Sequence, residues 1–343
     1  MSKHIFSAIK FLVFLGLGIL LTWLAIKDIP EADKPVILQA ILDANYGWVV
    51  LAMIVGLLAH LSRAIRWKMF FEPLGFTPKT SNTFYAVMIG YLGNLAVNRM
   101  GEVLRCGILK RYEKIPITQS FGTVIAERVI DSLVLLLLFV ISIWSQYEKL
   151  HTYISDNAIA PLKLKVVHIL ENKAILFLML GAALALMVCL YLLRKKILNN
   201  RITLKVRDLL MSFWEGMRTV SKMKNPGLFI FHTLFIWAMY LMSVYMCVFA
   251  FSETRVLTIT DCITIMAFGS LGVIATPGGI GAYQLIIQAL LPLLHACFVG
   301  ANGMDAAPSA IAFGWVVWLA QTVVVLVVGL LSFGLLALLN EEE

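Results

Sequence analysis

Apolar segments of bilayer length recur along almost the entire chain, and this pattern constrains the fold more than any other feature. A transmembrane helix needs about 20 consecutive apolar residues. The sequence is 60% hydrophobic and only 14% charged, whereas soluble domains are roughly a quarter charged. We therefore expect an all-α integral membrane protein in which a single transmembrane domain covers residues 1–343. Six segments are predicted to cross the membrane completely: 5–26, 46–62, 118–147, 174–193, 227–251 and 308–339.

Two further apolar segments are interrupted in the middle. Residues 82–112 consist of two halves, each shorter than a full span, with polar sequence between them. Residues 259–298 are broken in the same way by ATPGGIGAY. Backbone that leaves helical geometry at membrane depth is tolerated only inside protein or against a watery cavity. The two segments are therefore predicted to form re-entrant helical hairpins.

The distribution of basic residues predicts the orientation. Most of the 28 Lys and Arg residues lie near the N-terminus or in the segments 62–81, 98–117 and 194–226. Because Lys and Arg are enriched in cytoplasmic loops, both termini are expected in the cytoplasm. Hairpin 82–112 then enters from the cytoplasm and hairpin 259–298 from outside, while residues 200–224 form a basic amphipathic helix on the cytoplasmic surface. The residues expected at the interface after the second span are Arg63, Arg66, Trp67 and Lys68.

The two predicted hairpins resemble each other in sequence. GYLGNLAVNRMGE at 90–102 aligns with GSLGVIATPGGIG at 269–281 after a shift of 179 residues. Three predicted spans separate the two segments, so the two copies would point in opposite directions. Such inverted-topology repeats are typical of transporters. We assign the first repeat to about 46–147 and the second to about 227–339.

The middle of the first hairpin, residues 94–105, concentrates polar and charged side chains within apolar sequence. Arg99, Arg105 and the free N–H groups at the start of a new helix would suit a phosphate. The alternative is that these charges only neutralise one another and span 118–147. We favour an anion site because two arginines exceed the charge of Glu102. The candidate substrate-binding residues here are Asn94, Asn98, Arg99, Glu102 and Arg105, and Gly101 is assigned to the hairpin bend.

Span 118–147 carries the motif Glu127-Arg128-x-x-Asp131. Ionisable residues inside a membrane are costly and by default functional. Glu127 and Asp131 are four residues apart and share one helix face, whereas Arg128 is rotated away. The two carboxylates would balance the arginines or relay protons; a buried structural network that clamps the first hairpin is the alternative. We assign Glu127, Arg128 and Asp131 to the candidate substrate site.

The second hairpin breaks at a proline and three glycines. Proline removes a backbone donor, and glycine permits unusual dihedrals and close approach of backbones. These residues are predicted to act in gating, although the glycines could instead serve tight helix packing. The predicted gating residues are Pro277, Gly278, Gly279 and Gly281, and the side chains expected to reach a headgroup are Tyr283 and Gln284.

Motifs for metal or cofactor chemistry are missing from the sequence. It has no H-E-x-x-H, no G-x-S-x-G and no phosphate loop. The five cysteines lie in or beside apolar segments without metal-binding spacing. We therefore expect no metal and no cofactor. The net charge of +8 resides in short loops beside apolar spans, which indicates contact with anionic lipid headgroups and not with nucleic acid.

Four motifs together resemble the family of the lysylphosphatidylglycerol synthase transmembrane region, also called flippase-like or UPF0104 proteins. They are R-x-x-R-W at 63–67, N-x-x-x-N-R-x-G-E-x-x-R at 94–105, E-R-x-x-D at 127–131 and P-G-G-x-G at 277–281. The resemblance implies a polytopic protein of the bacterial inner membrane that moves a lipid between leaflets. Family members often carry a proline where this chain has Asn98. Bifunctional members add an aminoacyltransferase domain, so synthesis of aminoacylated lipid is not expected from these 343 residues.

The leading hypothesis is a lipid translocase. Its substrate would be a phosphate-bearing lipid such as an aminoacyl-phosphatidylglycerol, a polyprenyl phosphate or a glycolipid precursor. Two alternatives remain open: an intramembrane transferase that acts on a lipid phosphate, and a non-catalytic partner of a separate glycosyl- or aminoacyltransferase. The absence of a nucleophile or metal motif favours a transporter over an enzyme.

Overall fold

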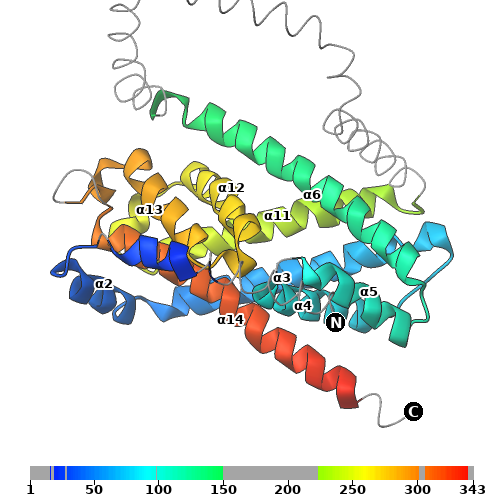
Figure 1. Ribbon diagram of the computed structural model, residues 1–343. Coiled ribbons are helices and arrows are strands. Elements are labelled where there is room, and N and C mark those ends of the chain that lie inside the picture. The colour runs from blue at the N-terminus through cyan, green and yellow to red at the C-terminus, as the bar shows by residue number, and fades with distance from the viewer. Residues whose placement is uncertain are drawn as a thin grey trace, which may run out of the picture.

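The computed structural model describes residues 16, 19–27, 29–97, 99–149, 223–300 and 306–338, and these fold almost entirely into helices (Figure 1). The predicted all-α class is therefore confirmed for the described part of the chain. Several sequence predictions lie wholly or mostly outside it: span 5–26, Asn98, span 174–193 and the amphipathic helix 200–224.

Three of the described helices are long and apolar enough to cross a membrane by length and composition. They are α3 (Tyr46–Met69), α11 (Pro226–Val248) and α14 (Pro308–Leu338). The first two pack along each other, and the Ser243 hydroxyl of α11 donates to the Ala52 carbonyl of α3 at 2.8 Å. The predicted span 118–147 is α6 (Ile117–Ser145), a helix of 29 residues. A short helix, α2 (Asp33–Leu42), precedes α3.

The predicted hairpin 82–112 consists of α4 (Thr80–Ala96) and α5 (Met100–Tyr112), packed antiparallel. Glycines bring the two backbones close together near the bend, where a Cβ atom on Gly101 would lie 2.0 Å from the Gly90 carbonyl oxygen. At the other end, the Glu113 carboxylate accepts hydrogen bonds from the Lys79 N–H and the Asn82 amide. The pair is therefore closed at its bend and also at its opposite end. We call this opposite end, where the first helix of a pair begins and the second ends, the base of the pair.

The predicted hairpin 259–298 consists of α12 (Ile259–Ala275) and α13 (Ala282–Leu294). At its bend, Gly272 lies against the backbone of Tyr283, leaving no room for a side chain. At its base, the Asp261 carboxylate lies 3.0 Å from His295 Nε2. Asp261 and Thr258 also form a capping box that starts α12.

The two helix pairs share lengths and bend geometry. Each begins with a helix of 17 residues and continues with one of 13 residues. Each bend contains a left-handed residue, Arg99 with φ 67° in the first pair and Gly278 with φ 61° in the second. Leu95 packs on Gly278, so the two bends meet inside the molecule.

The bases of the two pairs lie at opposite ends of the bundle, and α6 runs from one to the other. Its first turn follows α5 after a short loop, beside the base of the α4–α5 pair. Its last turn leads to Gln146, whose amide donates to Asp261 at the base of the α12–α13 pair, at 2.8 Å. Figure 1 shows this long crossing of α6 over the other helices.

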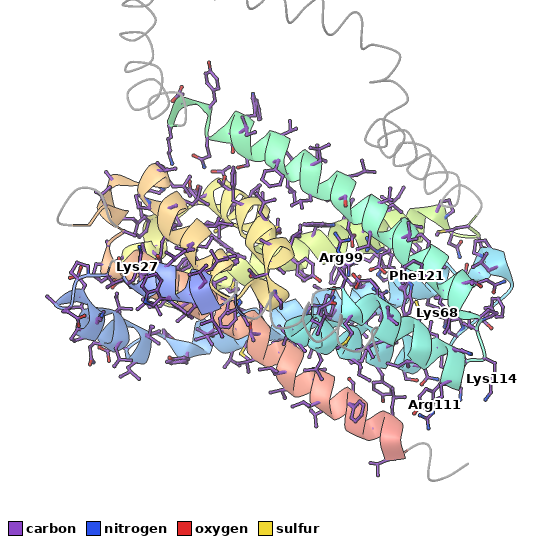
Figure 2. The ribbon with its side chains drawn as sticks, viewed as in Figure 1. Lys27, Lys68, Arg99, Arg111, Lys114 and Phe121 are labelled. Atoms are coloured by element: carbon purple, nitrogen blue, oxygen red, sulfur yellow. The ribbon has the colours of Figure 1, made fainter. Side chains whose placement is uncertain are left out.

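Basic side chains gather at the end of the bundle where α4 begins. Figure 2 shows Lys68, Arg111 and Lys114 together at this end, with Lys27 at the opposite one. The Lys68 ammonium group donates to the Thr80 hydroxyl at the start of α4. The base of the α4–α5 pair is thus the strongly basic end of the described structure.

Candidate functional site

Two arginines of α3 form the centre of a buried charged cluster. Arg63 and Arg66 are 4% and 0% exposed, respectively. They are three residues apart and therefore share a helix face. The sequence places them at the membrane interface after a span ending at residue 62, and it does not predict that they are buried in the protein. Helix α3 continues to Met69 and carries both side chains into the protein interior.

The carboxylates that pair with these arginines come from α6. Arg63 Nη1 donates to Glu127 Oε1 at 2.8 Å and to Asp131 Oδ2 at 2.6 Å. Arg66 Nη2 donates to Asp131 Oδ1 at 2.7 Å, and its Nη1 reaches the Thr233 hydroxyl of α11 at 3.3 Å. The predicted common face of Glu127 and Asp131 is thus directed at α3.

A third arginine reaches the cluster from the first helix pair. Arg105 Nη2 on α5 donates to Glu127 Oε2 at 2.6 Å. Its guanidinium group also lies 3.9 Å from the centre of the Trp67 ring, in cation–π geometry. Trp67 is held in turn by a hydrogen bond to the Thr123 hydroxyl at 3.0 Å. Glu127 therefore joins α3, α5 and α6 through one carboxylate.

The cluster carries an excess of positive charge among the residues that the structure describes. Arg63, Arg66 and Arg105 face two carboxylates, those of Glu127 and Asp131. The Nε atom of each of these three guanidinium groups is buried without a hydrogen-bond partner in the described part. Buried charges are costly unless paired, and buried donors unless bonded. An additional anion would compensate for the excess positive charge and would accept hydrogen bonds from the unpaired Nε donors.

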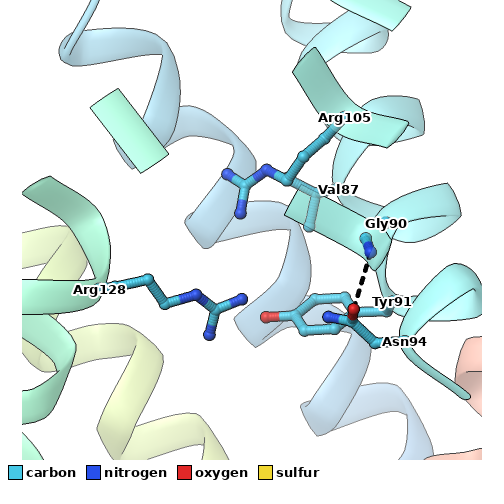
Figure 3. Close-up of a pocket in the computed structure, with 7 residues that line it drawn as sticks. Val87, Gly90, Tyr91, Asn94, Arg105 and Arg128 are labelled. Atoms are coloured by element: carbon cyan, nitrogen blue, oxygen red, sulfur yellow. Dashed lines mark hydrogen bonds between the residues drawn. The ribbon is translucent and has the colours of Figure 1, made fainter. Parts of the chain in front are cut away.

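A narrow crevice opens beside the cluster, between the first helix pair and α6. Figure 3 shows Arg105 and Arg128 reaching toward it from two sides, with the Tyr91 hydroxyl near the Arg128 guanidinium group. The Arg128 side chain is 43% exposed and lies 3.3 Å from Glu102. The crevice is too narrow to admit a water-sized group. Its lining consists of Val87, Gly90, Tyr91, Asn94, Gly101, Arg105 and Arg128.

The structure separates the residues predicted for the first hairpin. Arg105 belongs to the cluster and Asn94 to the crevice, where its side-chain oxygen accepts the Gly101 N–H at 2.8 Å. Glu102 pairs with Arg128 at the edge of the crevice. Arg99 is exposed at the bend. The predicted pair of phosphate-binding arginines is therefore not assembled from Arg99 and Arg105; Arg128 stands beside Arg105 instead.

The residues predicted for the second hairpin do not reach the charged cluster. Tyr283 is 8% exposed and fills the space above Gly269 within its own helix pair. Gln284 is 1% exposed, and both atoms of its amide are buried without a partner among the described residues. Pro277 is buried in the bend, whose three glycines all have positive φ: Gly278, Gly279 and Gly281.

Arg63 and Arg66 are not among the site residues that the sequence predicts. The motif R-x-x-R-W could have indicated them, because two arginines three residues apart lie on the same face of a helix. The sequence instead predicts both at the interface, because the predicted span ends one residue before Arg63. Across the described ranges, no group of three or more His, Cys, Asp or Glu side chains could hold a metal ion.

Long apolar helices around a buried arginine–carboxylate cluster define a polytopic integral membrane protein. The model of the lysylphosphatidylglycerol synthase transmembrane region matches residues 7–329. The chain therefore belongs to that family, which confirms the resemblance found in the motifs.

Two relatives show how far the sequence similarity extends. The UPF0104 membrane protein MJ1595 of Methanocaldococcus jannaschii is 33% identical over 123 residues, which cover 34% of this chain and 36% of that protein. Glycosyltransferase AglD of Haloferax volcanii is 29% identical over 118 residues, which cover 34% of this chain but 19% of that protein. The matches thus span about a third and a fifth of these relatives. No solved structure matches significantly.

Proposed function

We propose that the protein moves a phosphate-bearing lipid between the two leaflets of a membrane. The observation that carries this proposal is the excess of buried guanidinium groups beside a crevice lined by Arg105 and Arg128. Guanidinium groups bind phosphate through paired, charge-assisted hydrogen bonds. The acyl or isoprenoid tail of the lipid would stay in the bilayer while its phosphate enters the crevice.

Glu127 and Asp131 serve in this proposal as internal counter-ions. A phosphate that binds Arg105 competes with Glu127 for the same guanidinium group, which is now 2.6 Å from the Glu127 carboxylate. Because Glu127 also holds Arg63 at 2.8 Å, competition at Arg105 would loosen the contact between α5 and the α3–α6 pair. Ligand binding would in this way widen the crevice, which is too narrow in this structure for a water-sized group.

The proposed transport path lies between two re-entrant hairpins. We propose that α4–α5 and α12–α13 belong to inverted repeats at about 46–147 and 227–339, and that the molecule has six full spans. The matching helix lengths, the opposed bases and the meeting bends support this arrangement. The basic end in Figure 2 would face the cytoplasm of a bacterial cell, together with both termini.

Leaflet exchange in proteoliposomes tests the proposed function. The probe is phosphatidylglycerol with a nitrobenzoxadiazole group on one acyl chain, and dithionite quenches the probe in the outer leaflet. Vesicles with the wild-type protein should exchange the lipid faster than empty vesicles. Arg128→Ala should slow exchange about tenfold through the loss of a charge-assisted hydrogen bond. Arg128 suits this test because its side chain is 43% exposed and its removal spares the buried cluster.

Arg111→Ala is the matched control, because Arg111 is an exposed arginine on α5 outside the crevice. It should exchange lipid within about twofold of the wild-type rate. Equal rates for wild type and Arg128→Ala would remove the crevice from the mechanism. A wild-type rate equal to that of empty vesicles, for phosphatidylglycerol and for a polyprenyl phosphate, would contradict lipid translocation itself.

The similarity to AglD favours a second candidate function. That relative is named a glycosyltransferase, and the matched segment is 19% of its length. The family region of this chain would then act as the membrane partner of a separate transferase that uses a lipid phosphate. Co-purification of such an enzyme with the protein, without any lipid exchange by the protein alone, would support this second function over the first.

A further inference from the structure

The second helix pair holds buried polar atoms that the proposed phosphate site does not use. Gln284 is 1% exposed, and both its amide oxygen and its amide nitrogen are buried without a partner among the described residues. The amide nitrogen of Gln288, one turn further along α13, is also unpartnered in that part of the structure. Buried amides are normally hydrogen-bonded because desolvation of an unpaired amide is costly.

The position of Gln284 mirrors that of Glu102 in the first helix pair. Each is the third residue of the 13-residue helix that follows the bend. A side-chain oxygen is buried and unpartnered in both, Oε2 in Glu102 and Oε1 in Gln284. The first pair therefore presents charged groups after its bend, and the second presents a neutral amide at the corresponding place.

The bends of the two helix pairs are in contact with each other. Leu95, the neighbour of the crevice-lining residue Asn94, packs on Gly278 at the bend of the second pair. Gln284 follows that bend in the first turn of α13. A lipid phosphate between Arg105 and Arg128 would thus lie on one side of the junction of the bends, with Gln284 on the other.

The chemistry of these atoms selects the class of group that they would bind. A phosphate or carboxylate accepts hydrogen bonds only, which would leave the Gln284 oxygen unpaired. A hydroxyl group both donates and accepts, so it can pair with the oxygen and the nitrogen of the amide. The Gln288 nitrogen adds one more donor. Hydroxyl-bearing headgroups therefore match the full set of unpaired atoms.

We propose that Gln284 and Gln288 form an uncharged subsite on α13 that binds a hydroxyl group of the lipid headgroup, while the arginine crevice binds its phosphate. This proposal rests on the proposed function, because it assigns a second part of the same ligand. The subsite would determine specificity: it favours hydroxylated headgroups over anionic headgroups of equal charge that lack hydroxyl groups.

Binding of two short-chain lipids to the full-length protein in detergent tests this subsite. Phosphatidylglycerol and phosphatidylmethanol are both phosphodiesters with one negative charge, but only the first carries headgroup hydroxyls. The wild-type protein should bind phosphatidylglycerol about five- to tenfold more tightly. Gln284→Leu should bind both lipids with the affinity that the wild-type protein has for phosphatidylmethanol. Gln288→Leu should lose part of the discrimination.

Gln39→Leu is the matched control, because Gln39 is an exposed glutamine on α2 that is paired with Asp43. It should keep the full discrimination. Gln284→Leu removes unpaired buried atoms, so its unfolding temperature without lipid should equal or exceed that of the wild-type protein.

The outcomes separate this subsite from the proposed function. If the wild-type protein binds both lipids equally, or if Gln284→Leu still discriminates, the subsite is refuted while the phosphate site stands. If neither lipid binds the wild-type protein, the phosphate site fails and the subsite fails with it.

Discussion

At the scale of single residues, the fold depends on how one carboxylate is shared. Glu127 is 0% exposed and lies within 2.8 Å of both Arg63 and Arg105, on two different helices. Without this carboxylate, Arg105 would lose its paired acid among the described residues, and Arg63 and Arg66 would share Asp131. Removing one partner from a buried ion pair costs much more than replacing the whole pair by apolar side chains.

Glu127→Gln should therefore lower the free energy of unfolding by about 3 to 5 kcal/mol, because the arginines then share the charge of Asp131 alone among their described partners. Thermal unfolding in detergent, followed by tryptophan fluorescence, measures the change. The double variant Glu127→Met with Arg105→Met should recover a large part of the loss. An unfolding temperature of Glu127→Gln equal to that of the wild-type protein would contradict the assigned charge balance.

At the scale of elements, the first helix pair depends on close contact between backbones. A Cβ atom at Gly101 would lie 2.0 Å from the Gly90 oxygen and 2.7 Å from its carbonyl carbon. Because the obstacle is backbone and not a flexible side chain, α4 and α5 would have to separate. That separation would displace Arg105 and Asn94, which line the crevice from these two helices.

Gly101→Ala should destabilise the protein by about 1 to 3 kcal/mol through this overpacking. Gly107→Ala on the same helix is the matched control, since nothing lies within 4 Å of its Cβ position. It should stabilise the protein by up to about 1 kcal/mol, because alanine favours a helix over glycine. Denaturation of both variants in one detergent gives the comparison, and an equal effect of the two would argue against the close approach of α4 and α5.

At the scale of the whole molecule, the proposed orientation rests on two bases at opposite ends. The α4–α5 base is surrounded by basic residues, as Figure 2 shows for Lys68, Arg111 and Lys114. The α12–α13 base ends beside Cys297, which is exposed. If the two pairs are re-entrant hairpins of inverted repeats, these bases face opposite sides of the membrane.

Labelling of cysteines in intact cells tests this orientation. A membrane-impermeant maleimide should label Cys297 from outside. Arg111→Cys in a Cys297→Ser background should be labelled only after the membrane is permeabilised, because Arg111 lies near the other base. The Cys297→Ser protein alone sets the background. Labelling of both positions from the same side would contradict opposed hairpins.

Much of the architecture follows from the sequence itself. The apolar runs determine an all-helical membrane protein because backbone groups in a bilayer must be hydrogen-bonded within the segment. The breaks in the short segments also follow from local chemistry, and the structure has turns between α4 and α5 and between α12 and α13. The shared face of Glu127 and Asp131 follows from helical periodicity alone.

The composition of the site was decided by tertiary structure. Sequence alone did not specify which arginine of the first hairpin pairs with Glu127, and it placed Arg63 and Arg66 at the interface. Packing of α3 against α6 and α11 buries the side chains of Arg63 and Arg66. Burial depends on which helices surround a residue and not on its neighbours in sequence. Long-range pairing of charges, which no local pattern encodes, then determines which arginines face the carboxylates.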